Sequence, residues 1–123
     1  GELGEAARAV AGLLHPHFLK EEEYALPPLG MLRELTGSRV TPDMKDVLGL
    51  TDRLKAELNQ MLAEHKSIVA ALERLSDAAK KAGKSEYAEF AEALMLHAQT
   101  EEEVLYPASI LIGEYVREKL GLR

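Results

Sequence analysis

The chain has 123 residues, of which 46% are hydrophobic and 29% charged, as is typical of one globular domain spanning residues 1–123. Its net charge of −6 argues against nucleic acid or an anionic membrane surface as a partner. The absence of cysteine excludes disulfides, thiolate metal sites and iron–sulfur clusters. No apolar run approaches the roughly 18–20 residues of a membrane span, and no signal peptide opens the sequence. We therefore expect a cytoplasmic protein.

The apolar periodicity predicts an all-α protein built from three long helical segments. The first segment runs from about residue 4 to residue 35, and its inward stripe consists of Val10, Leu14, His17, Glu21 and Tyr24. Pro16 and the Pro27–Pro28 pair lie inside this segment. Because a proline lacks an N–H and crowds the carbonyl group four residues earlier, we expect bends rather than a straight helix.

The second segment is expected to begin after Thr41, with Pro42 at its first helical position, and to end before Gly83. Its inward stripe has a histidine at its centre and consists of Leu54, Leu58, Met61, His65, Ile68 and Leu72.

The third segment is predicted to be capped by Ser85 and to bend at Pro107 before it continues from about residue 110 to residue 120. Its predicted inner face also carries a histidine and consists of Phe90, Leu94, His97, Glu101 and Leu105.

One motif occurs twice in the sequence, as H-x3-E-E-E-x3-P, and its copies start at His17 and His97. A chain with four histidines and five prolines is not expected to repeat this pattern by composition alone. Residues four apart share one face of an α-helix, so Glu21 and Glu101 each lie on the same side as the preceding histidine. Each copy therefore offers an imidazole nitrogen and a carboxylate to the same point.

The inward histidines and glutamates form a candidate metal site. A single histidine on an apolar stripe is usually a hydrogen-bonded core residue, and that interpretation remains the alternative. A buried carboxylate, however, is costly unless it is paired or bound to a cation. A metal ion would compensate all the inward polar groups together, so we predict metal ligation by His17, Glu21, His65, His97 and Glu101.

The residues that flank these ligands are predicted to play smaller parts. Most of the remaining glutamates of the two motifs are expected to form solvated acidic faces, although Glu22 and Glu102 could accept hydrogen bonds from a ligating ring. His15 lies about 200° around the helix from His17 and is not expected to reach the same site. Tyr24 is predicted to pack in the core, and the Tyr106 hydroxyl could reach a site carboxylate.

The ligand types restrict the metal. Three imidazoles with two carboxylates suit iron or manganese, and also zinc, whereas no sulfur ligand favours copper. Five ligands with bridging carboxylates would suit two metal ions. The Glu-x-x-His signature of ferritin-like di-iron bundles is absent, because leucines stand three residues before each inward histidine. The HExxH signature of metalloproteases is also absent.

These residues resemble the hemerythrin-like domain, also called the HHE cation-binding domain. The segments HPHFLKEEEYALPPL, EHKSIVAALERL and HAQTEEEVLYPAS resemble the motifs of its second, third and fourth helices. The resemblance implies an up-and-down four-helix bundle around a non-haem di-iron centre. It places His17 and Glu21 on the second helix, His65 on the third, and His97 and Glu101 on the fourth. The two glutamates would be the bridging ligands.

The sequence departs from this family pattern in two places. The family's first helix, which normally supplies another histidine, has no counterpart in the sequence. A segment that precedes it, or a partner chain such as a second copy, would complete the bundle. The helix of His65 also lacks the second histidine of oxygen-carrying hemerythrins, because Met61 and Val69 stand at those positions. The resemblance thus favours the sensor or stress-response branches over oxygen transport.

The sequence is compatible with three functions. The first is a non-haem iron protein that binds or senses O₂, NO or peroxide, or that serves iron homeostasis. The second is an enzyme, a di-iron oxidoreductase or iron-centre repair protein that turns over a small oxidant. The third is a helical interaction module without metal, in which the histidines only pack.

Overall fold

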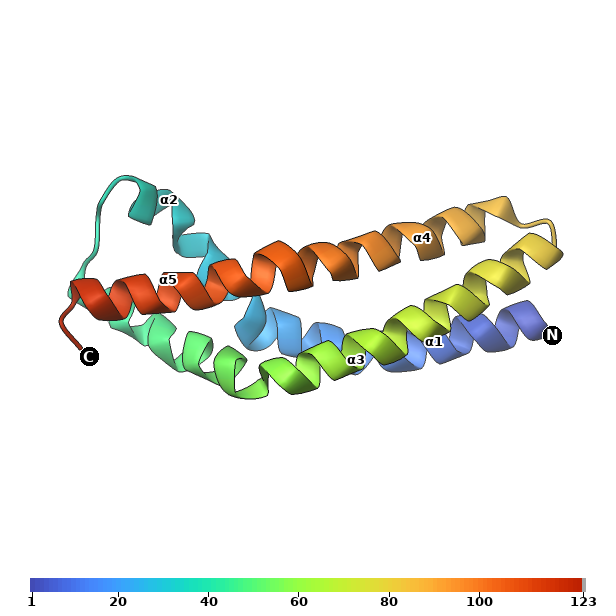
Figure 1. Cartoon of the computed structure of the whole chain (residues 1–123), viewed down its shortest axis with the longest axis horizontal. Helices are drawn as coiled ribbons and strands as arrows, with labels where there is room; N and C mark the ends of the chain where they lie inside the picture. The colour runs from blue at the N-terminus through green and yellow to red at the C-terminus, as the bar shows by residue number, and fades with distance from the viewer. Residues whose placement is uncertain (123) are drawn as a thin grey trace.

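The computed structural model describes residues 1–122, and that part of the chain contains helices and loops but no strand. Three antiparallel helical segments run along the molecule, with the N-terminus at one end and the C-terminus at the other (Figure 1). The all-α prediction and its three long segments are therefore confirmed. In chain order the elements are α1 (Glu2–Lys20), the π-helical turn η1 (Glu21–Ala25), the 3-10 turn η2 (Pro27–Met31), α2 (Leu32–Thr36), the 3-10 turn η3 (Pro42–Asp46), α3 (Val47–Lys81), α4 (Ser85–Thr100), the π-helical turn η4 (Glu101–Leu105) and α5 (Tyr106–Lys119).

Helix α3 is the central element, because it packs against α1, α4 and α5. The stripe predicted for the second segment is confirmed. Five of its six members are buried and the sixth, Leu58, is partly buried. The predicted stripe of the first segment is also confirmed, since its members are buried apart from the partly buried Leu14. Helix α3 ends as predicted, with Gly83 at a φ of 70° that favours glycine.

The predicted inner face of the third segment is confirmed for Glu101, which is buried, and in part for Leu94 and Leu105, which are partly buried, but it is wrong for the other two residues. Phe90 is 56% exposed, and His97 is also exposed. The face that is buried consists of the small residues Ala88, Ala91 and Ala98. Alanines let the backbones of α3 and α4 come close together, so the large apolar residues of α4 are displaced to its flanks. Ser85 is likewise the first residue of α4 rather than its cap, which is Lys84.

Both copies of the repeated motif contain a π-helical turn at the same place. The N–H of Leu26 donates to the carbonyl oxygen of Glu21 at 3.0 Å, and the N–H of Tyr106 donates to that of Glu101. A proline stands two residues after each π turn, directly after the residue whose N–H closes the wide hydrogen bond. Because proline has no N–H to donate, the helical hydrogen-bond pattern is interrupted there in any case. The motif thus sets the position of each π turn.

An apolar groove of about 760 Å³ separates α1 from α4. Its walls are formed mainly by apolar side chains, among them Leu3, Val10 and Leu14 of α1 and Tyr87 and Phe90 of α4. The completion of the bundle by another helix or a second copy stays a prediction. None of the described helices combines the length and the apolar character needed to cross a bilayer.

Gly113 sets the distance between α5 and α3, and its replacement by alanine is expected to destabilise the protein. A Cβ at this position would lie 2.5 Å from the Cβ of Thr51 and would also clash with its hydroxyl oxygen. We expect a loss of about 1–3 kcal/mol from this overpacking, measured by denaturant unfolding. The control is Gly49→Ala in α3, where an added Cβ meets nothing within 4 Å. It should stabilise the helix by roughly 0.5–1 kcal/mol, and equal stability of the two variants would contradict the prediction.

Candidate metal centre

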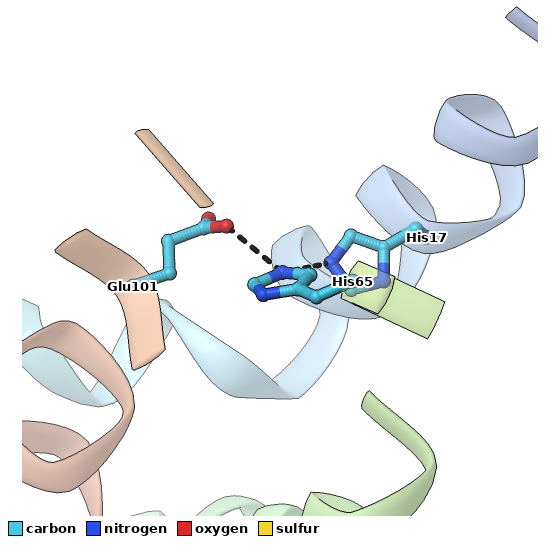
Figure 2. Close-up of side chains that lie close together, drawn as sticks. All are labelled: His17, His65 and Glu101. Carbon is cyan, nitrogen blue, oxygen red and sulfur yellow. Dashed lines mark hydrogen bonds and ion pairs between the residues drawn. The ribbon is translucent and has the colours of Figure 1, made fainter. Parts of the chain in front are cut away.

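Three buried side chains from three segments meet in the middle of the bundle. They are His17 of α1, His65 of α3 and Glu101 at the start of η4, and we call them the central cluster (Figure 2). Each of these residues is only 2% exposed. The Nε2 atoms of the two imidazoles are 2.9 Å apart, and the Nε2 of His65 is 3.2 Å from Oε1 of Glu101. One donor atom of each residue thus points to the same small volume.

A carboxylate contacts the Nδ1 atom of each imidazole of the central cluster, on the side of the ring opposite Nε2. Oε1 of Glu64 is 2.8 Å from Nδ1 of His17, and Oε1 of Glu102 is 3.0 Å from Nδ1 of His65. Burial raises the pKa of Glu64, but hydrogen bonds from Lys20, His17 and Gln60 together lower it to about 2. Because a carboxylate only accepts hydrogen bonds, each Nδ1 carries a proton and donates it. In the neutral imidazoles both Nε2 atoms are then unprotonated.

This arrangement leaves too few protons at the centre of the site. Two Nε2 lone pairs face each other at 2.9 Å, and no donor hydrogen lies between them when both rings are neutral. Oε2 of Glu101 is buried and accepts no hydrogen bond. Such groups are costly in the interior unless a cation compensates them. Ligating histidines typically donate their other ring N–H to a carboxylate, which is the pattern of Glu64 and Glu102 here.

Glu21 and Tyr106 lie beside the central cluster. Oε1 of Glu21 is 3.5 Å from Nε2 of His17, and the Tyr106 hydroxyl donates to Oε2 of Glu21 at 3.1 Å. Burial raises the pKa of Glu21, although His17 and the hydroxyl of Tyr106 oppose that shift. Burial, together with the charge of Glu21, also raises the pKa of Tyr106, so that the phenol is protonated. The predicted reach of the Tyr106 hydroxyl to a site carboxylate is confirmed.

His65 favours the neutral form of its ring. Burial lowers the pKa of His65, and the neighbouring His17 lowers it further, whereas Glu102 acts in the opposite direction. A neutral imidazole is the form that binds metal ions. The electrostatics of the site therefore prepare Nε2 of His65 as a ligand.

His97 lies at the edge of the site rather than inside it. Its side chain is 51% exposed, but its Nε2 is 3.2 Å from Oε2 of Glu101. The carboxylate of Glu101 consequently lies between His65 on one side and His97 on the other. Of the five predicted ligands, the structure brings His17, His65 and Glu101 together, with Glu21 adjacent and His97 at the surface.

The flanking residues agree with the sequence in part. His15 is exposed, as expected, and Tyr24 is fully buried, with its hydroxyl 3.6 Å from the sulfur of Met61. Glu102 forms a hydrogen bond with the imidazole of His65, as the sequence suggested for Glu22 and Glu102. Glu64 was not identified from the sequence as a partner of His17. The only indication in the sequence is that Glu64 directly precedes the inward-facing His65. A residue at that position points about 100° away from its neighbour, here toward α1.

Comparison with known proteins agrees with this geometry. The family model of the hemerythrin HHE cation-binding domain matches residues 1–109, which include the central cluster and both copies of the motif. Searches among curated proteins and among solved structures found no match. Because the family match extends over most of the sequence and the His–Glu cluster lies within it, the chain belongs to the hemerythrin HHE cation-binding domain family.

Proposed function

We propose that this protein binds non-haem iron at the central cluster and uses it to bind or sense a small molecule such as O₂, NO or peroxide, or to serve iron homeostasis. The observation that carries the proposal is the shortage of protons: two Nε2 lone pairs and Oε1 of Glu101 converge in the interior, and Oε2 of the same buried carboxylate accepts no hydrogen bond. A cation satisfies all three groups at once. Iron, when bound, supplies open coordination positions and one-electron chemistry.

The donor set fits iron. Two histidines and one carboxylate on one side of a site, with further positions open, form the ligand set of many non-haem iron proteins. Manganese and zinc accept the same nitrogen and oxygen donors, so the metal is identified by elemental analysis rather than by ligand type. The absence of cysteine from the sequence leaves no thiolate to favour a closed structural zinc site.

Glu101 and Glu21 provide the reason to propose a second ion. Oε1 of Glu101 faces His65, while its Oε2 faces His97. One carboxylate would therefore supply an oxygen ligand to each of two neighbouring metal ions. Glu21 likewise turns Oε1 to His17 and Oε2 to Tyr106. We propose that these two glutamates bridge the ions, and that His97 holds the one nearer the surface.

The remaining residues of the site have definite tasks. Glu64 and Glu102 hold the two rings in one orientation and keep the proton on Nδ1, so that Nε2 stays available. A cavity of about 350 Å³ lies beside His65 and is lined also by Val69 and Glu102, and we propose it as the entry route for a small ligand. Turnover of an oxidant by the same site, which would make the protein an enzyme, stays an alternative that a steady-state assay with an electron donor would decide.

Metal content is the direct test of this proposal. Protein purified without chelator is expected to carry one or two metal ions per chain, and the variants His17→Ala and His65→Ala are expected to lose them. The matched control is His15→Ala, because His15 lies on the same helix but is exposed. Elemental analysis, with circular dichroism to verify folding, gives the answer. Equal metal content in all four proteins would favour the interaction module without metal.

A further inference from the structure

The hydroxyl group of Tyr106 lies against three polar atoms of the site. Its oxygen is 3.2 Å from Nε2 of His17, 3.2 Å from Nε2 of His65 and 3.1 Å from Oε2 of Glu21. The residue is fully buried. A phenol has one proton, so it donates to only one of these three acceptors. Hydrogen bonding by itself therefore does not explain why the oxygen lies where the two imidazole lone pairs meet.

The π turn η4 is what brings Tyr106 to this position. In a regular α-helix, residues five apart are separated by about 140° around the axis, so Tyr106 would point away from the face of Glu101. In η4 the N–H of Tyr106 bonds to the carbonyl oxygen of Glu101, which makes these residues neighbours one wide turn apart. The equivalent position of the first motif, 80 residues earlier, is Leu26. The tyrosine is thus a feature of the second copy alone.

The spacing of the donor atoms matches a coordination shell. Adjacent ligands of a six-coordinate ion with bonds of about 2.1 Å are about 3.0 Å apart. The separations here are 2.9 Å between the two Nε2 atoms, 3.2 Å from the hydroxyl to each of them, and 3.2 Å from His65 to Glu101. The hydroxyl oxygen is also as close to both imidazoles as a neighbouring ligand would be.

We propose that Tyr106 is itself a ligand of the metal ion and binds through its phenolate oxygen beside His17, His65 and Glu101. This inference rests on the proposed metal site. On binding, the O–H bond breaks, a metal–oxygen bond forms, and the proton passes through Oε2 of Glu21, which accepts the hydrogen bond of this hydroxyl at 3.1 Å, to solvent water. A phenolate is a hard anionic donor, so the ligand set would favour ferric iron over softer cations.

Iron loading with optical and resonance Raman spectroscopy tests the assignment. Wild-type protein loaded with ferric iron should show a visible charge-transfer band from phenolate to iron and enhanced tyrosinate ring vibrations. Tyr106→Phe should lose both signals while it retains bound iron. The matched control is Tyr24→Phe, because Tyr24 is also fully buried but contacts Met61 instead of the site. That variant should keep both signals.

The possible outcomes separate this inference from the proposed function. Bound iron without the band in the wild-type protein, or a band that persists in Tyr106→Phe, would overturn the role of Tyr106 and leave the metal site intact. Failure of the wild-type protein to bind iron would overturn both. If Tyr106→Phe does not fold by circular dichroism, the Raman spectrum of the wild-type protein still decides whether a tyrosine binds, and Tyr24→Phe shows whether it is Tyr24.

Discussion

Replacement of both bridging candidates by glutamine is expected to abolish metal binding and to stabilise the metal-free protein. In the absence of a cation, Glu21 and Glu101 are acids buried to 98%, and burial raises the pKa of Glu21. Glutamine keeps their shape without a charge. Replacement of buried ion pairs by uncharged residues of similar volume is often neutral or stabilising by about 1–4 kcal/mol, and we expect the two carboxylates to give a gain at the lower end of that range. Denaturant unfolding of chelator-treated Glu21→Gln, Glu101→Gln protein at neutral pH measures the gain.

The pH dependence of Glu21→Gln alone checks the cause of this gain. A carboxyl whose folded pKa is raised contributes its full stability below its unfolded pKa, near the ordinary value of 4.5, and loses that contribution as the pH rises through the folded pKa. The advantage of Glu21→Gln over the wild-type protein should therefore be largest at neutral pH and vanish near pH 4.5.

A matched double variant controls for the change in net charge. Glu22→Gln, Glu103→Gln removes one carboxylate from each copy of the motif at exposed positions. Such surface substitutions usually change stability by no more than about 0.5 kcal/mol, and metal content should not change. Equal stability of the buried and exposed double variants at every pH would show that the two buried carboxylates are compensated without a metal ion.

Glu64→Gln is expected to weaken metal binding although Glu64 is not a predicted ligand. Its carboxylate accepts the Nδ1 proton of His17 and also binds Lys20. Glutamine can still accept that proton through its carbonyl oxygen, but it cannot supply the negative charge that makes the ring a better ligand. Loss of such a partner typically lowers metal affinity by about 10–100-fold. Competition titration with a chromophoric chelator measures this change.

The control for this prediction lies on the same helix. Glu57→Gln removes a carboxylate from α3 that pairs with the exposed Arg53 rather than with a histidine. Metal affinity is expected to stay at the wild-type value in this variant. If Glu64→Gln binds metal as tightly as Glu57→Gln does, the hydrogen bond to Nδ1 does not tune the site.

The sequence by itself determined the helical class, the inward stripes of the first two segments and the identity of the principal polar residues. Periodicity was sufficient there because His17 and His65 lie in stripes whose other members are mostly large apolar residues. The repeated motif was equally informative, because a histidine and a glutamate four residues apart must share a helical face.

Only the tertiary structure decided which of these side chains meet. The inner face of α4 depends on how closely two backbones approach, and alanines allow a contact that a count of large residues does not reveal. The π turns shift the register after Glu101, so that Tyr106 faces the site although its sequence spacing is not helical. Glu64 became a partner of His17 because α1 packs beside α3. Local periodicity describes one helix at a time, whereas a metal site is made by the distances between helices.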